Sequence, residues 1–353
     1  MARRSFNLFG RRSLNRSLNV MTRMAVRAGA KAVKAALKLV PGKKPKARAK
    51  PKARAKSNPA KATSPSVMSV GVVGSRRYRL YIPPGSQTGA VRPLLVMLHG
   101  CAQDGQAIAS VSRMNRVAAR EGFFVLYPEQ DRMANLQGCW NWFATRSGQA
   151  QREADAVVAM VDQVCRAQRV DVGKLAIAGL SAGASLAVLL ATRHPARFRA
   201  VAMHSGIAPG TAQSQATALR AMRGRGPAPP CLAPPANGLR LPALLVIQGS
   251  ADHVVAPRNA LDAALQWAEC GGAKAGTARP VQRGNRYTAT VTDFKAGTQL
   301  VATHCLINGL GHAWSGGAKG QAYSDEGGPD ASRMVWAFAS KQFNAAPEML
   351  LNT

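Results

Sequence analysis

A single serine lies in the pentapeptide Gly-Leu-Ser-Ala-Gly at residues 179–183, at the junction of two apolar runs. The run before it, residues 174–180, is typical of a buried strand, and the alanine-rich run after it predicts a helix. A serine on a sharp strand-to-helix turn exposes its hydroxyl beside free helix N–H groups, which suits a nucleophile. The alternative interpretation is a tight packing turn without a chemical role. The strand–turn–helix context favours Ser181 as a nucleophile.

A serine nucleophile needs a histidine base, and that base needs a carboxylate to orient it. After a strand–turn–helix serine, the acid comes first along the chain and the histidine second. Asp252 ends the predicted strand 242–252, at the same carboxyl edge as Ser181, and is the expected acid. His312 lies in a glycine-rich loop beyond the last predicted strand and is the expected base, with His253 as the alternative.

Negative charge that develops on a substrate oxygen requires N–H donors. One donor is expected from Ala182, directly after the serine, and the other from Cys101, in the loop after an earlier predicted strand. Cys101 as a nucleophile of its own is the rival interpretation, but the pattern assigns it no base. Two histidines have a structural interpretation, because His194 precedes a proline at a helix end and His204 lies inside a predicted strand.

Strands and helices must alternate to position these residues. Short apolar runs predict buried strands, and segments with helical spacing separate them. Such alternation favours an α/β fold with a mainly parallel sheet and helices on both faces. The expected strands are 76–84, 92–100, 123–130, 174–180, 197–206 and 242–252, with a hairpin at 287–309. The expected helices are 107–122, 153–170, 185–195, 258–270 and 332–343, and residues 208–240 fit an excursion near the active-site edge.

Charge divides the 353-residue chain near residue 66. Of its 48 Lys and Arg residues, 19 lie in residues 1–65, which contain no acid; 48 − 19 leaves 29 basic against 16 acidic residues in the remainder. The sequence predicts three parts: a basic, largely disordered tail (1–65) with an amphipathic helix at 20–40, a catalytic domain (66–345) and a C-terminal extension (346–353). The tail is an expected electrostatic anchor for DNA, polyphosphate or an anionic lipid surface; the alternative is a solubilising extension.

The six cysteines are scattered and include no CxxC pair, so zinc-ribbon and thioredoxin-like sites are not indicated, and no metal or cofactor is expected. No apolar run is long enough for a transmembrane helix. Arginines interrupt the N-terminal residues, so a secretory signal peptide is not predicted. We therefore expect a cytoplasmic protein, with secretion by a non-obvious route as the alternative.

Six motifs occur in order across residues 68–345: LLVMLHGCAQD, VLYPEQ, CWNWF, AGLSAGASLAVLLATRHPARFRAVAMHSG, VIQGSADHVV and GLGHAWSGG. Together they resemble the poly(3-hydroxyalkanoate) depolymerase and esterase family, an α/β-hydrolase group related to acetylxylan and feruloyl esterases. The resemblance implies Ser181 as nucleophile, Asp252 as acid and His312 as base, and it suggests Cys101 and Ala182 as oxyanion donors.

Three tryptophans lie in or beside these motifs. Trp140, Trp142 and Trp314 are expected to form apolar walls for a hydroxyacyl chain; the alternative is an ordinary core or surface role. The family likeness also suggests a disulfide between Cys101 and Cys139, whereas a cytoplasmic setting argues against it.

The leading hypothesis is a serine carboxylesterase that acts on poly(3-hydroxybutyrate), related short-chain polyhydroxyalkanoates or their oligomers, with tethering to storage granules as an associated expectation. A feruloyl or acetylxylan esterase is the second. A polyanion- or granule-binding protein with secondary hydrolase activity is the third.

Overall fold

The computed structural model describes residues 66–345, apart from residues 87, 88 and 237. The predicted basic tail (1–65), its amphipathic helix at 20–40 and the extension at 346–353 lie outside the described residues. Within the described part, no helix is long and apolar enough to cross a membrane.

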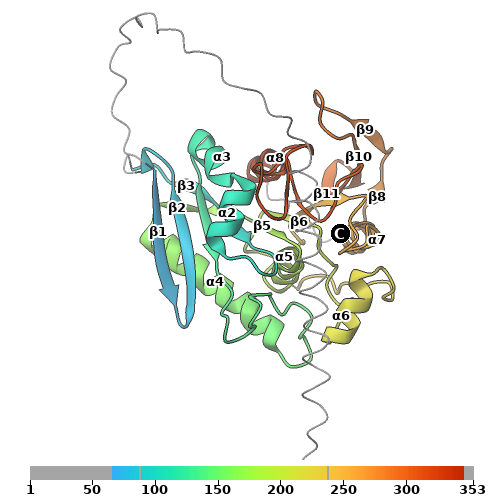
Figure 1. The fold of residues 1–353 in the computed structure, drawn as a ribbon, viewed down its shortest axis with the longest axis horizontal. Helices are drawn as coiled ribbons and strands as arrows, with labels where there is room; N and C mark the ends of the chain where they lie inside the picture. Colours follow the sequence, from blue (N-terminus) through green and yellow to red (C-terminus); the bar gives the residue numbers. More distant parts are fainter. Residues whose placement is uncertain (1–65, 87–88, 237, 346–353) are drawn as a thin grey trace, which may run out of the picture.

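One large sheet forms the middle layer of the molecule (Figure 1). Its strands follow the order β1-β2-β4-β3-β5-β6-β7-β11-β10-β8, and β9 pairs with β10. The six central strands from β4 to β11 run parallel, and the pairs toward both edges are antiparallel. The bounds are β1 (Val67–Val73), β2 (Arg76–Ile82), β3 (Arg92–Leu98), β4 (Phe124–Pro128), β5 (Val170–Leu180), β6 (Ala200–His204), β7 (Ala243–Gly249), β8 (Lys274–Ala275), β9 (Arg279–Val281), β10 (Ala289–Ala296) and β11 (Gln299–Ile307).

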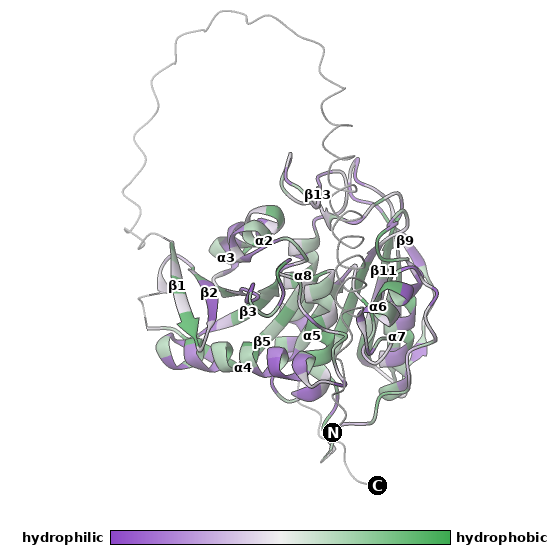
Figure 2. Cartoon of the chain, turned by 60° about the horizontal axis from the view of Figure 1, so that its bottom comes forward, coloured by the Kyte–Doolittle hydropathy of each residue, from purple (hydrophilic) through white to green (hydrophobic). Residues whose placement is uncertain are grey.

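Helices cover both faces of this sheet, as Figure 2 shows for α2 and α3 on one side and α4 on the other. Apolar side chains of α4, α5 and α7 join one core cluster, and those of α2, α3 and α8 join the other. The central strands are apolar without alternation because both of their faces are covered; all seven residues of β7 are buried. The bounds are α2 (Gly105–Ser112), α3 (Met114–Glu121), α4 (Gln149–Ala167), α5 (Ala182–Arg193), α6 (Gln215–Met222), α7 (Arg258–Cys270) and α8 (Ala331–Asn344).

The α/β fold class predicted from the sequence is confirmed, and several local details differ from the expectation. The single helix expected over 107–122 is two helices, because Arg113 adopts φ 54° and its guanidinium donates a hydrogen bond to the carbonyl oxygen of Gly316. The excursion at 208–240 contains α6, whose N-cap Ser214 accepts from the N–H of Thr217. A short parallel pair, β12 (Trp314–Ser315) with β13 (Ser324–Asp325), shapes the loop after β11.

Candidate active site

Ser181 stands on a sharp turn between β5 and α5, with φ 57° and ψ −119°. A non-glycine residue rarely adopts positive φ, so the surrounding structure must hold this turn in place. A Cβ at Gly179 would lie 2.4 Å from the carbonyl carbon of Gly183, and a Cβ at Gly183 would lie 2.5 Å from the carbonyl oxygen of His99. Both glycines are therefore required by packing, and the turn places the Ser181 side chain on the cavity wall.

The structure brings Ser181, His312 and Asp252 into one hydrogen-bonded chain. The Ser181 Oγ lies 3.1 Å from His312 Nε2, and His312 Nδ1 lies 2.8 Å from Asp252 Oδ2. The three residues come from the turn after β5, the loop after β7 and the loop after β11, which meet at the carboxyl edge of the parallel sheet. The alternative base His253 is exposed and takes no part in these hydrogen bonds.

Asp252 is 2% exposed, and four donors surround its carboxylate. Oδ1 accepts from the N–H groups of Val254 and Val255, and Oδ2 accepts from Gln248 Nε2 and from His312. Burial alone would raise the pKa of Asp252, but His312 and the two backbone N–H groups outweigh it and lower that pKa. An ionised Asp252 accepts the Nδ1–H of His312, so Nε2 presents its lone pair to the Ser181 hydroxyl.

Cys101 and Ala182 both line the cavity beside Ser181. Ala182 opens helix α5, so its N–H has no acceptor within the helix and points along the positive end of the helix dipole. The loop that carries Cys101 is fixed on its other side, because the N–H of Gly100 donates to Gln103 Oε1 over 2.9 Å. The structure thus brings the two residues expected as oxyanion donors, Cys101 and Ala182, to the same cavity wall as Ser181.

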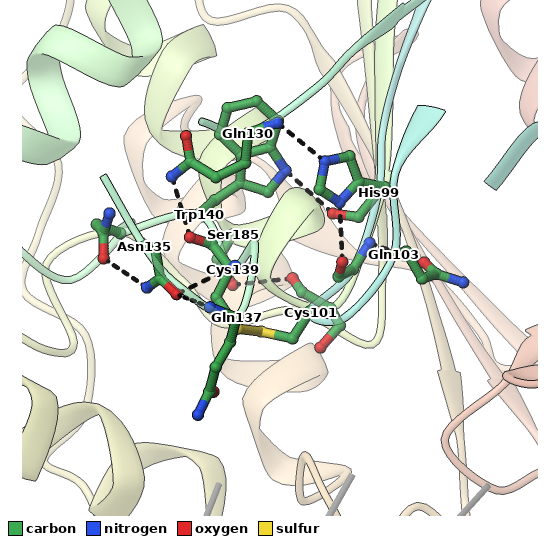
Figure 3. The surroundings of a disulfide bond; sticks show 12 residues. His99, Cys101, Gln103, Gln130, Asn135, Gln137, Cys139, Trp140 and Ser185 are labelled. Carbon is green, nitrogen blue, oxygen red and sulfur yellow. Dashed lines mark hydrogen bonds between the residues drawn. A yellow bond between two sulfur atoms is a disulfide. The ribbon is translucent and has the colours of Figure 1, made fainter. Parts of the chain in front are cut away.

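A disulfide joins Cys101 to Cys139, so the Cys101 sulfur is not a free nucleophile (Figure 3). The bond connects the loop after β3 to the loop 131–141. Buried Glu153 also holds the loop 131–141. Its carboxylate accepts hydrogen bonds from the Asn141 N–H, from the Asn141 side chain and from Gln130 Nε2. The covalent link and this polar network together hold the two loops in one position.

The three tryptophans expected as pocket walls divide into two groups. Trp140 and Trp142 line the cavity, although Trp140 is fully buried and donates its indole N–H to the carbonyl oxygen of His99. Trp314 does not reach the cavity: it is 1% exposed in the core and stacks on His204. The proximity of Trp314 to His312 in the sequence is misleading, because the indole packs into the core, where it stacks on His204 and donates its N–H to Ser332 Oγ.

The cavity has a volume of about 700 Å³ and is lined mainly by apolar groups. Two of its lining residues, Met133 and Leu136, are 90% and 84% exposed. Sequence reasoning missed both residues; the available signal was a methionine and a leucine inside the otherwise polar loop DRMANLQG. We call Met133 and Leu136 the apolar lip of the cavity.

A parallel sheet that carries a serine on a strained turn, followed in the chain by an acid and a histidine in contact with it, defines an α/β-hydrolase of the serine esterase class. The sequence profile of the esterase PHB depolymerase family matches residues 76–285, more than half of the chain. The chain belongs to this family and is an ester hydrolase. Ser181 and Asp252 lie within the matched residues, and His312 lies beyond them.

Individual relatives agree with this assignment. Poly(3-hydroxyalkanoate) depolymerase C of Paucimonas lemoignei is 30% identical over 241 residues, which cover 66% of this chain and 57% of that protein. Feruloyl esterase B of Neurospora crassa is 28% identical over 205 residues, which cover 54% of this chain and 68% of that protein. Acetyl xylan esterase from Aspergillus awamori shares the fold, with a TM-score of 0.56 and 19% identity over 70% of this chain and 94% of that one.

Proposed function

We propose that the protein hydrolyses carboxylic esters through an acyl-enzyme on Ser181, with His312 as general base and Asp252 as its orienting acid. Ser181 Oγ attacks the ester carbonyl carbon as its proton passes to His312 Nε2. The N–H groups of Cys101 and Ala182 hold the oxyanion. The alcohol leaves with the proton from Nε2, and a water molecule then releases the acid by the same route. The contact chain of 3.1 Å and 2.8 Å carries this proposal.

The proposed substrate is poly(3-hydroxybutyrate), another short-chain polyhydroxyalkanoate, or their oligomers. The relationship to a poly(3-hydroxyalkanoate) depolymerase supports it. So does the cavity, whose walls suit an aliphatic acyl chain and whose apolar lip faces the solvent where a longer substrate would extend.

Feruloyl or acetylxylan ester hydrolysis is the second candidate, because relatives with those names match the same part of the chain. The discriminating experiment compares 3-hydroxybutyrate oligomers, amorphous polymer granules, acetylated xylan and feruloyl esters at equal enzyme concentration. We expect the highest kcat/KM for the 3-hydroxybutyrate oligomers. A higher value for a feruloyl or acetylxylan ester would reassign the substrate and leave the serine mechanism intact.

Residues 1–65 are proposed to bind a polyanionic surface such as DNA, polyphosphate, anionic lipid or a storage granule. Their 19 Lys and Arg residues without any acid support this proposal. Deletion of residues 1–65 should leave hydrolysis of soluble esters unchanged and abolish binding to DNA or anionic vesicles at low salt. Equal binding by both forms across a salt titration would reduce the tail to a solubilising extension and rule out the third candidate, a polyanion-binding protein.

We also propose a cellular compartment for the protein from its disulfide bond. The disulfide between Cys101 and Cys139 favours an oxidising environment over the cytoplasm expected from the sequence, because cytosolic thiols are kept reduced. Mass spectrometry of the protein from its native cells, after thiol alkylation without reduction, reads the state of these two cysteines directly. A fully alkylated pair would favour the cytoplasm.

A further inference from the structure

His204 ends strand β6 at the point where the loops of Ser181 and His312 meet. Its carbonyl oxygen accepts the N–H of Ser181 over 2.9 Å, which ties the strained turn to the neighbouring strand. Its ring Nε2 lies 3.2 Å from the N–H of Ser315, three residues after His312. His204 therefore contacts the backbone of the turn that carries Ser181 and the backbone of the loop that carries His312.

These contacts define the protonation state of the His204 ring. A backbone N–H only donates, so Nε2 must be the acceptor and the ring proton lies on Nδ1, which donates to the Ser205 Oγ at 3.1 Å. Burial, with a smaller contribution from His312, lowers the pKa of His204 to about 3, although Asp252 opposes this shift. His312 and Asp252 are the titratable groups that act on it. The ring thus stays neutral, and able to accept, throughout the pH range in which an esterase works.

Packing fixes the ring in the same position. His204 is 1% exposed and stacks on Trp314, with ring centroids 5.1 Å apart and an angle of 25° between the planes. The Trp314 indole N–H donates to Ser332 Oγ, whose hydroxyl donates to the carbonyl oxygen of Ser112. The loop of His312 is therefore held between β6 on one side and helix α8 on the other. Trp314, which the sequence analysis expected to line the substrate pocket, instead helps to hold the His204 ring and the loop of His312 in place.

We propose that His204 is a positioning residue that sets the distance between Ser181 and His312: its backbone holds the nucleophile and its ring holds the loop of the base. The inference rests on the proposed function, because it concerns the geometry of the same proton transfer. In the described structure, the hydrogen bonds of the His204 ring go to Ser205 and to the Ser315 N–H and not to Ser181 Oγ or the His312 ring, so it acts through the backbone. A displacement of about 1 Å between such groups can cost on the order of 100-fold in rate.

Two amide substitutions at His204 separate this role from general stability. The oxygen of Gln can reach the position of Nε2 and accept from Ser315, whereas the shorter Asn reaches only the position of Nδ1. His204→Gln should keep kcat within about threefold of the wild type. His204→Asn should lower kcat at least tenfold with KM unchanged for a soluble p-nitrophenyl ester. His304→Asn is the matched control, since His304 is a half-buried histidine in the same sheet whose Nε2 has no hydrogen-bond partner in the described structure.

Burst titration with the p-nitrophenyl ester counts competent sites, so each kcat refers to folded enzyme. If His204→Asn does not fold, Ser205→Ala replaces it: that change removes the acceptor of Nδ1–H and should lower kcat at least threefold. The shape of the pH–rate profile should match the wild type in the Gln variant, because His204 transfers no proton.

Equal kcat in the Gln and Asn variants, alongside an inactive Ser181→Ala enzyme, would overturn the role of His204 and leave the proposed function standing. A loss of kcat in His304→Asn as large as that in His204→Asn would also overturn it. An active Ser181→Ala enzyme would instead refute the proposed function itself.

Discussion

The floor and the lip of the cavity are built in opposite ways. On the floor, Ser181 and His312 line the cavity, and Asp252 lies behind them, almost fully buried, with two hydrogen bonds accepted by each of its carboxylate oxygens. At the lip, Met133 and Leu136 are apolar and almost fully exposed, on a loop held by the disulfide of Cys139 and by Glu153 beneath it. The polar groups of the floor find their hydrogen-bond partners within the chain. The apolar side chains of the lip are exposed to solvent until an apolar ligand covers them.

This difference separates chemistry from substrate choice. Buried, paired polar groups gain their strength from fixed geometry in a site without water, which suits proton transfer. Exposed apolar side chains stabilise a complex by about 1.5–3 kcal/mol each, and only when a ligand covers them. Changes at the floor should therefore affect every ester equally, whereas changes at the lip should affect only substrates that extend beyond the cavity.

The largest expected effect is at Ser181, the proposed nucleophile. Ser181→Ala should reduce kcat for p-nitrophenyl butyrate by a factor on the order of 10⁴–10⁶, with an unchanged far-ultraviolet circular dichroism spectrum. The same loss should appear with polymer granules, because the floor serves all substrates. Retention of activity within tenfold would refute Ser181 as the nucleophile.

Asp252→Asn should cost on the order of 10³–10⁴ in kcat, because an amide in this position favours the wrong tautomer of His312. The neighbouring change His253→Ala is the control and should retain most of its activity, since His253 is exposed and outside the hydrogen-bonded chain. Steady-state kinetics on one soluble ester measures both. The reverse result, with an inactive His253→Ala and an active His312→Ala, would make His253 the base.

The double change Met133→Ser and Leu136→Ser should leave kcat/KM for p-nitrophenyl acetate within about twofold. Hydrolysis of amorphous polyester granules should fall about tenfold, because the exposed apolar surface that contacts the particle is lost. Turbidity loss of the granules and release of nitrophenol follow the two reactions. Equal losses on both substrates would show that the lip does not distinguish them.

Removal of the disulfide should have a smaller effect on rate. Cys139→Ser should lower kcat severalfold, since Cys101 carries a proposed oxyanion donor, and should destabilise the protein by about 2–4 kcal/mol. The exposed free cysteine Cys231 supplies the control Cys231→Ser. Thermal unfolding without reductant compares the variants, and an unchanged melting temperature in Cys139→Ser would contradict a structural role of the bond.

The smallest expected effect is a pH dependence of stability. The pKa of His204 is about 3 in the folded chain, against about 6.5 for an unfolded histidine. Between these values the unfolded chain binds a proton that the folded chain does not, so this stability is complete above about pH 6.5 and falls as the pH decreases, by at most about 1.4 kcal/mol per unit. His204→Gln should flatten this slope in urea unfolding between pH 6.5 and 4.5. An unchanged slope would contradict a neutral buried ring.

The positions of Ser181, Asp252 and His312 could be predicted because the alternation of strands and helices places their loops at one edge of the sheet. The fold class followed from the same alternation. The break at Arg113 could not be predicted, since it depends on a contact with Gly316 more than 200 residues away. Local patterns do not encode such distant contacts.

The direction in which a side chain points was the second feature that the sequence could not predict. Trp314 is close to His312 in sequence, yet it points into the core. His204 was interpreted as structural because a strand histidine gives no sign of which loops its ring will meet. The disulfide of Cys101 was only suggested by family likeness, since six cysteines allow 15 pairings. Met133 and Leu136 gave a weak signal, as their exposure depends on how the loop is held.

The central claim is that Ser181 forms a covalent acyl-enzyme because His312 and Asp252 activate it. The most direct measurement is mass spectrometry of the protein after brief reaction with an alkyl fluorophosphonate, followed by peptide mapping. We predict one adduct, located on Ser181, and slow or absent labelling of Asp252→Asn under the same conditions. An adduct on another residue such as Ser185 or Ser205, or labelling of Asp252→Asn at the wild-type rate, would contradict the account.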